Sequence, residues 1–187
     1  METISPAGRV VQPIALLLPI EIRTEIVRHL RDAAPLEGVG LLAAKPESPD
    51  GIVRGNRYYC GTNQDASATR YTMAPDEVLA AFRDIEEHGW RLGGIVHSHP
   101  AGAPDPSPTD RREYRYPEAL MIIVSLAGDV PELRAWWLGD GAHGRPAEVP
   151  VVDSEQRAPA TRREEEQSWV SRSLQDGPAT AARPGGT

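Results

Sequence analysis

Two histidines, His97 and His99, end a short apolar stretch that begins at Gly93. Successive side chains of a strand alternate between its two faces, so both imidazoles would point the same way, with Cα atoms roughly 6.6 Å apart. Asp110 follows after a loop rich in proline and glycine, which would bring its carboxylate back beside the histidines. Three protein ligands with one open position are typical of catalytic zinc, whereas structural zinc sites are closed by four ligands. The pattern therefore indicates the metal site of an enzyme.

Each part of this pattern also has an ordinary structural explanation. A His-x-His pair at the end of a strand is more often a pair of surface or hydrogen-bonded histidines. Ser107, Pro108 and Asp110 have the residue types of a helix start, with a capping hydroxyl, a proline in the first position and an acidic residue in the third. That explanation accounts for the serine and the aspartate but not for the two histidines before them, so the combination favours a metal site.

The composition limits the classes of protein and of metal site that are possible. Cys60 is the only cysteine, so a metal would be bound by His, Asp or Glu, and the two-cysteine pattern of zinc deaminases is excluded. The net charge of −7 argues against binding to nucleic-acid phosphates, which needs a positive field. The sequence has neither a membrane-spanning apolar run nor a recognisable signal peptide, so we expect a cytoplasmic protein without a membrane partner.

Apolar periodicity predicts the elements that position these side chains. Helices are expected at 19–33 and 77–88, and a short one from Pro108. Strands are expected at 13–18, 36–43, 52–60, 93–99, 119–126 and 133–138, with a possible edge strand at 149–152. This irregular alternation predicts an α/β sandwich around a mixed, curved sheet.

Two further segments have open alternatives. Glu37 lies in the apolar stretch Leu36–Ala43, where a carboxylate is disfavoured unless it is paired or used. It is either a charge at the start of a strand that faces solvent or a general base with a raised pKa near the metal. Residues 70–73 are either an ordinary connecting strand or an edge strand that pairs with an extended peptide.

The chain is expected to form one domain with two flanking segments. Residues 1–12 are expected to be a flexible N-terminus, and 13–153 the folded domain. From residue 154 the sequence turns to Arg, Glu, Pro, Ala, Ser and Gly, which predicts a disordered tail over 154–187. The tail ends in Gly185-Gly186-Thr187, so trimming of its own terminus stays an alternative.

Glu37, His97, His99, Ser107 and Asp110 together resemble the JAMM/MPN+ metalloprotease pattern, in which a glutamate precedes His-x-His-x7-Ser-x2-Asp. The resemblance covers roughly residues 13–153 and is strongest to the stand-alone prokaryotic members. It implies a single-domain α/β/α sandwich around a curved mixed sheet, with a layout like that of cytidine deaminases.

The same resemblance implies roles for these residues. His97, His99 and Asp110 would bind one zinc ion per chain. Glu37 would be the acid/base that activates a zinc-bound water, and Ser107 would support the oxyanion. The family hydrolyses amide bonds at or after the Gly-Gly tail of small ubiquitin-like or sulfur-carrier proteins, which would be the partner. The resemblance does not indicate an oligomeric state.

Two alternatives within the resemblance stay open. The loop Pro100–Pro106 is similar to that of the RadC-like branch, whose motif has the same spacing and which would have a different substrate. Some MPN proteins are docking modules that have lost their metal ligands, although all the ligand positions are present in this chain.

Overall fold

The structure, a computed structural model, describes residues 12–139 and 145–153. The segments expected to be a flexible N-terminus (1–12) and a disordered tail (154–187) lie, except for residue 12, outside the described residues, so both stay predictions. No helix in the described ranges is long and apolar enough to cross a membrane. The elements, in chain order, are β1 (Ala15–Leu17), α1 (Ile20–Ala33), β2 (Val39–Ala44), β3 (Ile52–Gly61), α2 (Pro75–Glu87), β4 (Arg91–His99), α3 (Pro108–Glu113), β5 (Leu120–Ser125), β6 (Glu132–Trp137), β7 (Ala147–Val149) and β8 (Val151–Val152).

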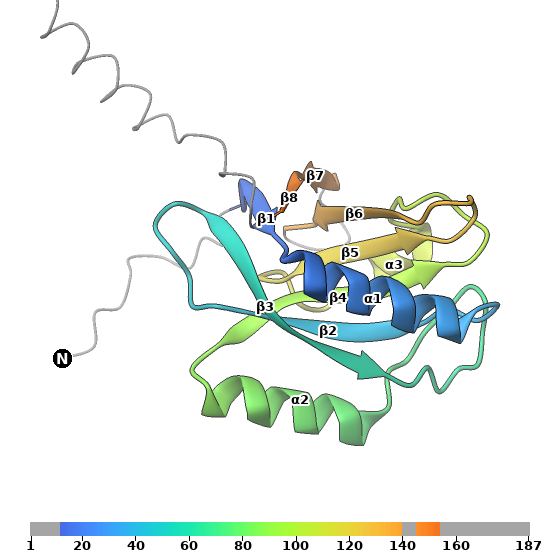
Figure 1. The fold of residues 1–187 in the computed structure, drawn as a ribbon, viewed down its shortest axis with the longest axis horizontal. Coiled ribbons are helices and arrows are strands. Elements are labelled where there is room, and N and C mark those ends of the chain that lie inside the picture. Colours follow the sequence, from blue (N-terminus) through green and yellow to red (C-terminus); the bar gives the residue numbers. More distant parts are fainter. Residues whose placement is uncertain (1–11, 140–144, 154–187) are drawn as a thin grey trace, which may run out of the picture. The chain divides into compact units, whose positions relative to one another are not determined.

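The strands form one mixed sheet with β4 near its centre. The order is β7-β6-β5-β4-β2-β3-β1-β8 (Figure 1). β4 pairs antiparallel with β2 and parallel with β5, so both of its edges are hydrogen-bonded. β7 and β8 lie at opposite ends of this order but are separated in the chain only by Pro150, so the curved sheet nearly closes on itself. The expected mixed, curved sheet is confirmed.

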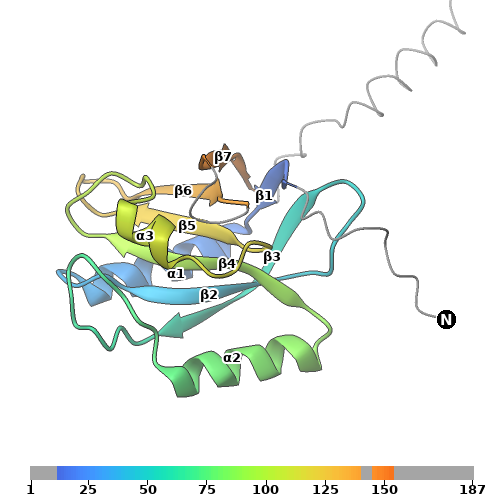
Figure 2. The ribbon, with the colours of Figure 1, turned by 180° about the vertical axis from the view of Figure 1, so that it is seen from behind.

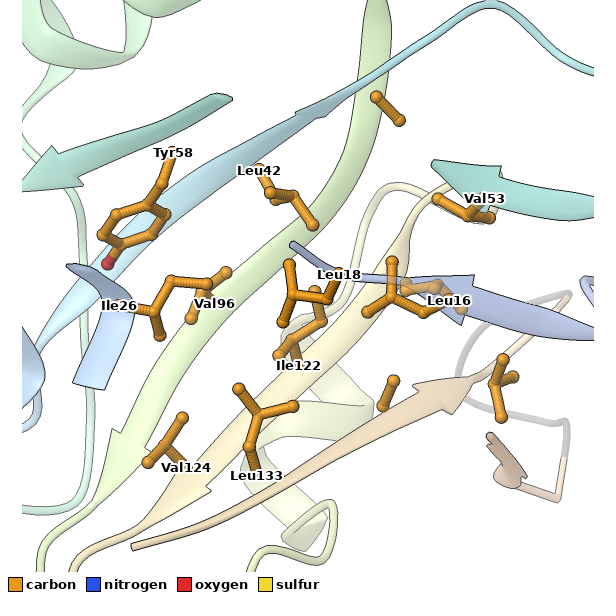
Figure 3. Close-up of a cluster of buried hydrophobic side chains, with 14 of the residues drawn as sticks. Leu16, Leu18, Ile26, Leu42, Val53, Tyr58, Val96, Ile122, Val124 and Leu133 are labelled. Atoms are coloured by element: carbon orange, nitrogen blue, oxygen red, sulfur yellow. The ribbon is translucent and has the colours of Figure 1, made fainter. Parts of the chain in front are cut away.

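Helices cover both faces of this sheet (Figures 1 and 2). α1 packs Ile26 into the larger core cluster together with Leu42 of β2 (Figure 3). Leu30 of α1 belongs to the same cluster. Leu41, the neighbour of Leu42, points to the opposite face and joins Ala81 of α2 in a second cluster. Because successive side chains of a strand point to opposite faces of the sheet, β2 contributes residues to the hydrophobic clusters on both faces. The arrangement agrees with the expected α/β/α layering.

Three segments differ from the sequence-based expectation. β2 begins at Val39, so Glu37 precedes the strand. Residues 70–73 form no strand and have one isolated bridge, Asn63 to Met73, because the Asn63 side chain bonds the backbone groups that a neighbouring strand would use. The expected edge strand at 149–152 is divided at Pro150, which has no backbone N–H and cannot continue a ladder.

Candidate metal centre

β4 delivers both histidines to the same face of the sheet. The His97 side chain is fully buried, and its Nε2 lies 3.3 Å from His99 Nε2. Asp110 reaches both, with Oδ1 3.4 Å from His97 Nε2 and Oδ2 3.4 Å from His99 Nε2. One donor atom from each of the three residues lies within 4.8 Å of the other two. The structure therefore brings the three expected ligands together into a group that can hold a metal ion.

The first turn of α3 holds Asp110 in this position. The Ser107 side chain accepts a hydrogen bond from the Asp110 backbone N–H at 3.1 Å, and Asp110 Oδ2 accepts one from the Ser107 backbone N–H at 2.7 Å. These two bonds form a reciprocal capping box, with Pro108 in the first helical position. The helix start expected from the sequence is thus present, and the same carboxylate serves the cap and the metal group.

The loop after β4 orients His99. Ala103 O lies 2.6 Å from His99 Nδ1, so the ring donates its Nδ1–H to a carbonyl. With Nδ1–H bonded to that carbonyl, Nε2, which donates to Asp110 Oδ2 in the metal-free site, is the nitrogen that can bind a metal once it loses its proton. Metal-binding histidines usually have a second bond of this kind, which fixes the tautomer and the ring orientation.

His97 is held differently, by packing. Its ring stacks on Tyr71, with centroids 4.6 Å apart and an interplanar angle of 29°. Within the described part of the chain, His97 Nδ1 is buried without a hydrogen-bond partner. Burial lowers the pKa of His97, more than its hydrogen bond to Asp110 raises it, which favours the neutral ring that a metal needs.

Asp110 is ionised in this setting. Burial by itself would raise the pKa of Asp110, but hydrogen bonds from His97 and His99 outweigh it and hold that pKa well below the usual range. The pKa of His99 is raised, because the hydrogen bonds to Asp110 and to Ala103 O outweigh the lowering caused by burial. Two imidazole nitrogens around one carboxylate are a donor set that suits zinc.

Glu37 lies at the end of the connection between α1 and β2 and is only 4% exposed, although residues 34–36 before it are exposed. Its Oε2 atom is buried and, among the described residues, without a hydrogen-bond partner. Burial raises its pKa to about 7, with the charge on His99 lowering and that on Asp110 raising it. The burial of Glu37 contradicts the alternative of a charge that faces solvent.

The backbone around Glu37 is fixed on two sides. On one side the loop 62–74 binds it, because Glu37 N–H donates to Ser67 O at 2.8 Å and Asn63 Nδ2 donates to Glu37 O at 2.9 Å. On the other side Ser98, between the two histidines, accepts the Gly38 N–H at 2.8 Å. The position of Glu37 relative to the histidine strand is therefore fixed by direct bonds.

Comparison with known proteins identifies the family. Residues 19–139 match the family of prokaryotic homologues of the JAB domain. This chain belongs to that family. A probable TtuB-protein conjugate cleaving protease of Thermus thermophilus is 35% identical over 128 residues, which cover 68% of this chain and 79% of that protein. A CysO-cysteine peptidase of Mycobacterium tuberculosis is 32% identical, covering 68% and 85%.

A solved relative supports the fold of this JAB-family chain. The solution structure of protein DSY2949 from Desulfitobacterium hafniense matches with a TM-score of 0.65 and 31% identity. The match covers 75% of this chain and 94% of that one. The expected family is thereby confirmed, together with its α/β fold.

Sequence reasoning missed the residues of this JAB-family site that support the expected ones. Asn63 lies in a polar loop and Tyr71 in a segment expected to be a strand. Ser98 lies inside the motif itself, and strand alternation places it on the face opposite the histidines. That alternation was the one signal in the sequence that could have assigned Ser98 a structural role.

Proposed function

We propose that this JAB-family chain is a zinc peptidase or isopeptidase. It hydrolyses an amide bond at or after the C-terminal Gly-Gly tail of a small ubiquitin-like or sulfur-carrier protein. The observation that carries the proposal is the convergence of His97, His99 and Asp110, together with a buried Glu37 whose Oε2 has no hydrogen-bond partner among the described residues. The relatives support the substrate class, since one is named for cleaving TtuB-protein conjugates and another for cleaving CysO-cysteine.

The ligand group fits zinc in its chemistry. Two neutral imidazoles and one carboxylate are a known catalytic zinc set. His97, His99 and Asp110 would hold the ion through Nε2, Nε2 and a carboxylate oxygen. When bound, zinc supplies Lewis-acid chemistry, which polarises a carbonyl and acidifies a water.

Glu37 carries the proton in this proposal. With a pKa of about 7 its carboxylate is ready both to accept and to release a proton near neutral pH. Its Oε2, which has no hydrogen-bond partner in the described part of the chain, takes the proton of the attacking water and delivers it to the departing amine.

Ser107 supplies a donor for the oxygen of the scissile carbonyl. Its Oγ accepts the Asp110 N–H with a lone pair, which leaves the hydroxyl hydrogen as a donor. A positioned donor of this kind stabilises the developing negative charge, typically by a few kcal/mol.

The location of the enzyme in the cytoplasm, expected from the sequence, stays a prediction.

The test is a cleavage assay paired with metal analysis. The substrate is a ubiquitin-fold carrier ending in Gly-Gly with an added C-terminal cysteine or peptide, and intact mass reports the product. We expect trimming to Gly-Gly, loss of activity on chelation, and recovery with zinc. Glu37→Gln should bind zinc normally and lose about 10²- to 10⁴-fold in rate, the usual contribution of general acid–base catalysis.

Three results would contradict the proposal or part of it. Purified protein that binds no zinc would favour the docking-module alternative. Zinc-loaded protein that leaves every Gly-Gly carrier intact would favour the RadC-like alternative with another substrate. Full activity of Glu37→Gln would remove Glu37 from the mechanism.

A further inference from the structure

The loop that follows β4, residues 100–106, presents three successive carbonyl groups to side chains of the domain. Gly102 O accepts a hydrogen bond from Ser125 Oγ at 2.6 Å. Ala103 O accepts from His99 Nδ1 at 2.6 Å. Pro104 O accepts from Trp136 Nε1 at 2.8 Å. The carbonyl that orients the histidine is therefore flanked on both sides by carbonyls bonded to the sheet.

We propose that Ser125 and Trp136 are positioning residues for the metal centre. They hold the loop so that the Ala103 carbonyl fixes the ring of His99. This inference rests on the proposed zinc site, and it adds two residues outside the His-x-His-x7-Ser-x2-Asp pattern.

Ser125 and Trp136, which we call the anchor residues, lie on regular, well-packed strands. Ser125 is 7% exposed and is the register partner of His99 across the parallel β4–β5 pair. Trp136 is paired with Met121 across β5 and β6, and its ring packs against a buried cluster that includes Met121 and Ile123. The place of the loop relative to β4 is thus set by the two strands that follow it in the sheet.

Within the loop, Pro104 is buried. Residues 101–103 are exposed and belong to no helix or strand. Arg134 forms an ion pair with Asp105 at 3.4 Å, but both side chains are more than a third exposed and bonds of that kind contribute little. The Ser125 and Trp136 bonds are side-chain hydrogen bonds that hold the carbonyls on either side of Ala103.

Losing these bonds should weaken metal binding through His99. A displaced Ala103 carbonyl no longer fixes the Nδ1–H, so the ring samples other orientations and tautomers. Removing a partner of a metal-binding histidine usually costs 10- to 100-fold in metal affinity. Removing one of the two bonds should lower zinc affinity less than removing both.

The experiment measures zinc affinity by competition with a chromophoric chelator, on the full chain. Trp136→Phe keeps a ring for packing and removes the N–H, while Ser125→Ala removes the hydroxyl. We expect about a 10-fold loss of affinity for each variant and a larger loss for the double variant. The cobalt-substituted variants should also show altered d–d absorption, which reports a changed ligand geometry.

Trp137→Phe is the matched control. Trp137 is the next residue on β6, is 6% exposed and packs into the α1 core on the opposite face. It should lower the unfolding temperature of the metal-free protein and leave zinc affinity and the cobalt spectrum unchanged. Trp136→Phe should lower zinc affinity and change the cobalt spectrum while leaving the unfolding temperature of the metal-free protein nearly unchanged. The pair of variants therefore separates loss of stability from loss of metal positioning.

Two outcomes would overturn the inference, and they are distinguishable. If the wild type binds zinc and cleaves its substrate, while both anchor variants bind zinc within twofold of it, only the positioning role is wrong. If the wild type itself binds no zinc, the proposed function is wrong and the positioning role falls with it.

Discussion

Two loops reach the histidine end of β4, and they are fastened in different ways. The loop 62–74, between β3 and α2, is organised by one of its own side chains. Asn63 bonds the backbone of Arg70 and Thr72 within the loop, and of Glu37 outside it. The loop 100–106 is instead bonded to the sheet, through Ser125 and Trp136.

The two loops also serve different parts of the site. The loop 62–74 holds the backbone of Glu37 and places Tyr71 on His97. The loop 100–106 holds His99 through Ala103 O. We infer that the first loop mainly controls proton transfer and the second mainly controls metal binding. Changes in the first should lower turnover, and changes in the second should lower zinc affinity.

Of the tests of this comparison, Ser107 gives the largest expected effect. It does not fit the division between the two loops, because it follows the second loop and yet is proposed to contact the substrate. Ser107→Gly removes the hydroxyl, and glycine is nearly as good a cap as serine. We expect kcat to fall about 10²- to 10³-fold, the usual cost of one oxyanion donor. Steady-state kinetics and zinc competition measure the two properties separately.

Ser107→Thr is the control, since it keeps the hydroxyl. It should retain most of the activity, and both variants should stay within about 1 kcal/mol of the wild type in free energy of unfolding. If Ser107→Gly loses zinc as strongly as it loses turnover, Ser107 acts through Asp110 and the oxyanion role is wrong.

The pH dependence of the free energy of unfolding tests the burial of Glu37, the residue held by the loop 62–74. The folded pKa is about 7 against an ordinary value of 4.5, so between these pH values the folded state keeps a proton that the unfolded state has lost. The free energy of unfolding should therefore fall as pH rises through this window, by at most about 3 kcal/mol, and level off above it.

Urea unfolding of metal-free protein at pH 4.5 and pH 8 measures this effect. Glu37→Gln removes the titrating group, so the wild type should lose stability relative to that variant as pH rises. Parallel pH profiles for the two proteins would show that Glu37 is less buried in solution than in the structure.

Asn63 gives the smallest effect and the most direct test of the comparison. Asn63→Ala removes the bond to Glu37 O and those that shape the loop, which should shift the carboxylate slightly and lower kcat about 10-fold. Zinc affinity should stay within twofold. Thr62→Ala, which removes a neighbouring exposed hydroxyl, should change neither.

An equal loss of kcat and of zinc affinity in Asn63→Ala would break the comparison. It would mean that the stacking of Tyr71 on His97 matters to the metal as much as the bond to His99 does.

The expected ligands could be predicted because the signals are local. Strand alternation places His97 and His99 on one face, and helix-start chemistry places Asp110 in the first turn of α3. The approach of Glu37 to them is not local. It depends on the pairing of β2 with β4, where Val39 lies opposite His97, and the family pattern supplied it.

The supporting residues could not be predicted for the same reason. The bond from Trp136 to Pro104 joins residues 32 apart, and that from Ser125 to Gly102 residues 23 apart. Neither bond has a sequence motif, because any side-chain donor at the correct place on the strand could bond the loop carbonyl. The prediction of a strand at 70–73 was wrong, because hydrogen bonds from the Asn63 side chain take the place of backbone pairing with another strand.

The division of the last strand at Pro150 has a practical consequence for anyone who expresses this domain. The family match ends at residue 139, but β7 covers the edge of β6 and β8 covers the edge of β1. A gene shortened to the family boundary would leave two rows of bare amide and carbonyl groups on one molecule, each able to template pairing with another copy. The recombinant product would then self-associate, although every residue of the metal centre would still be encoded.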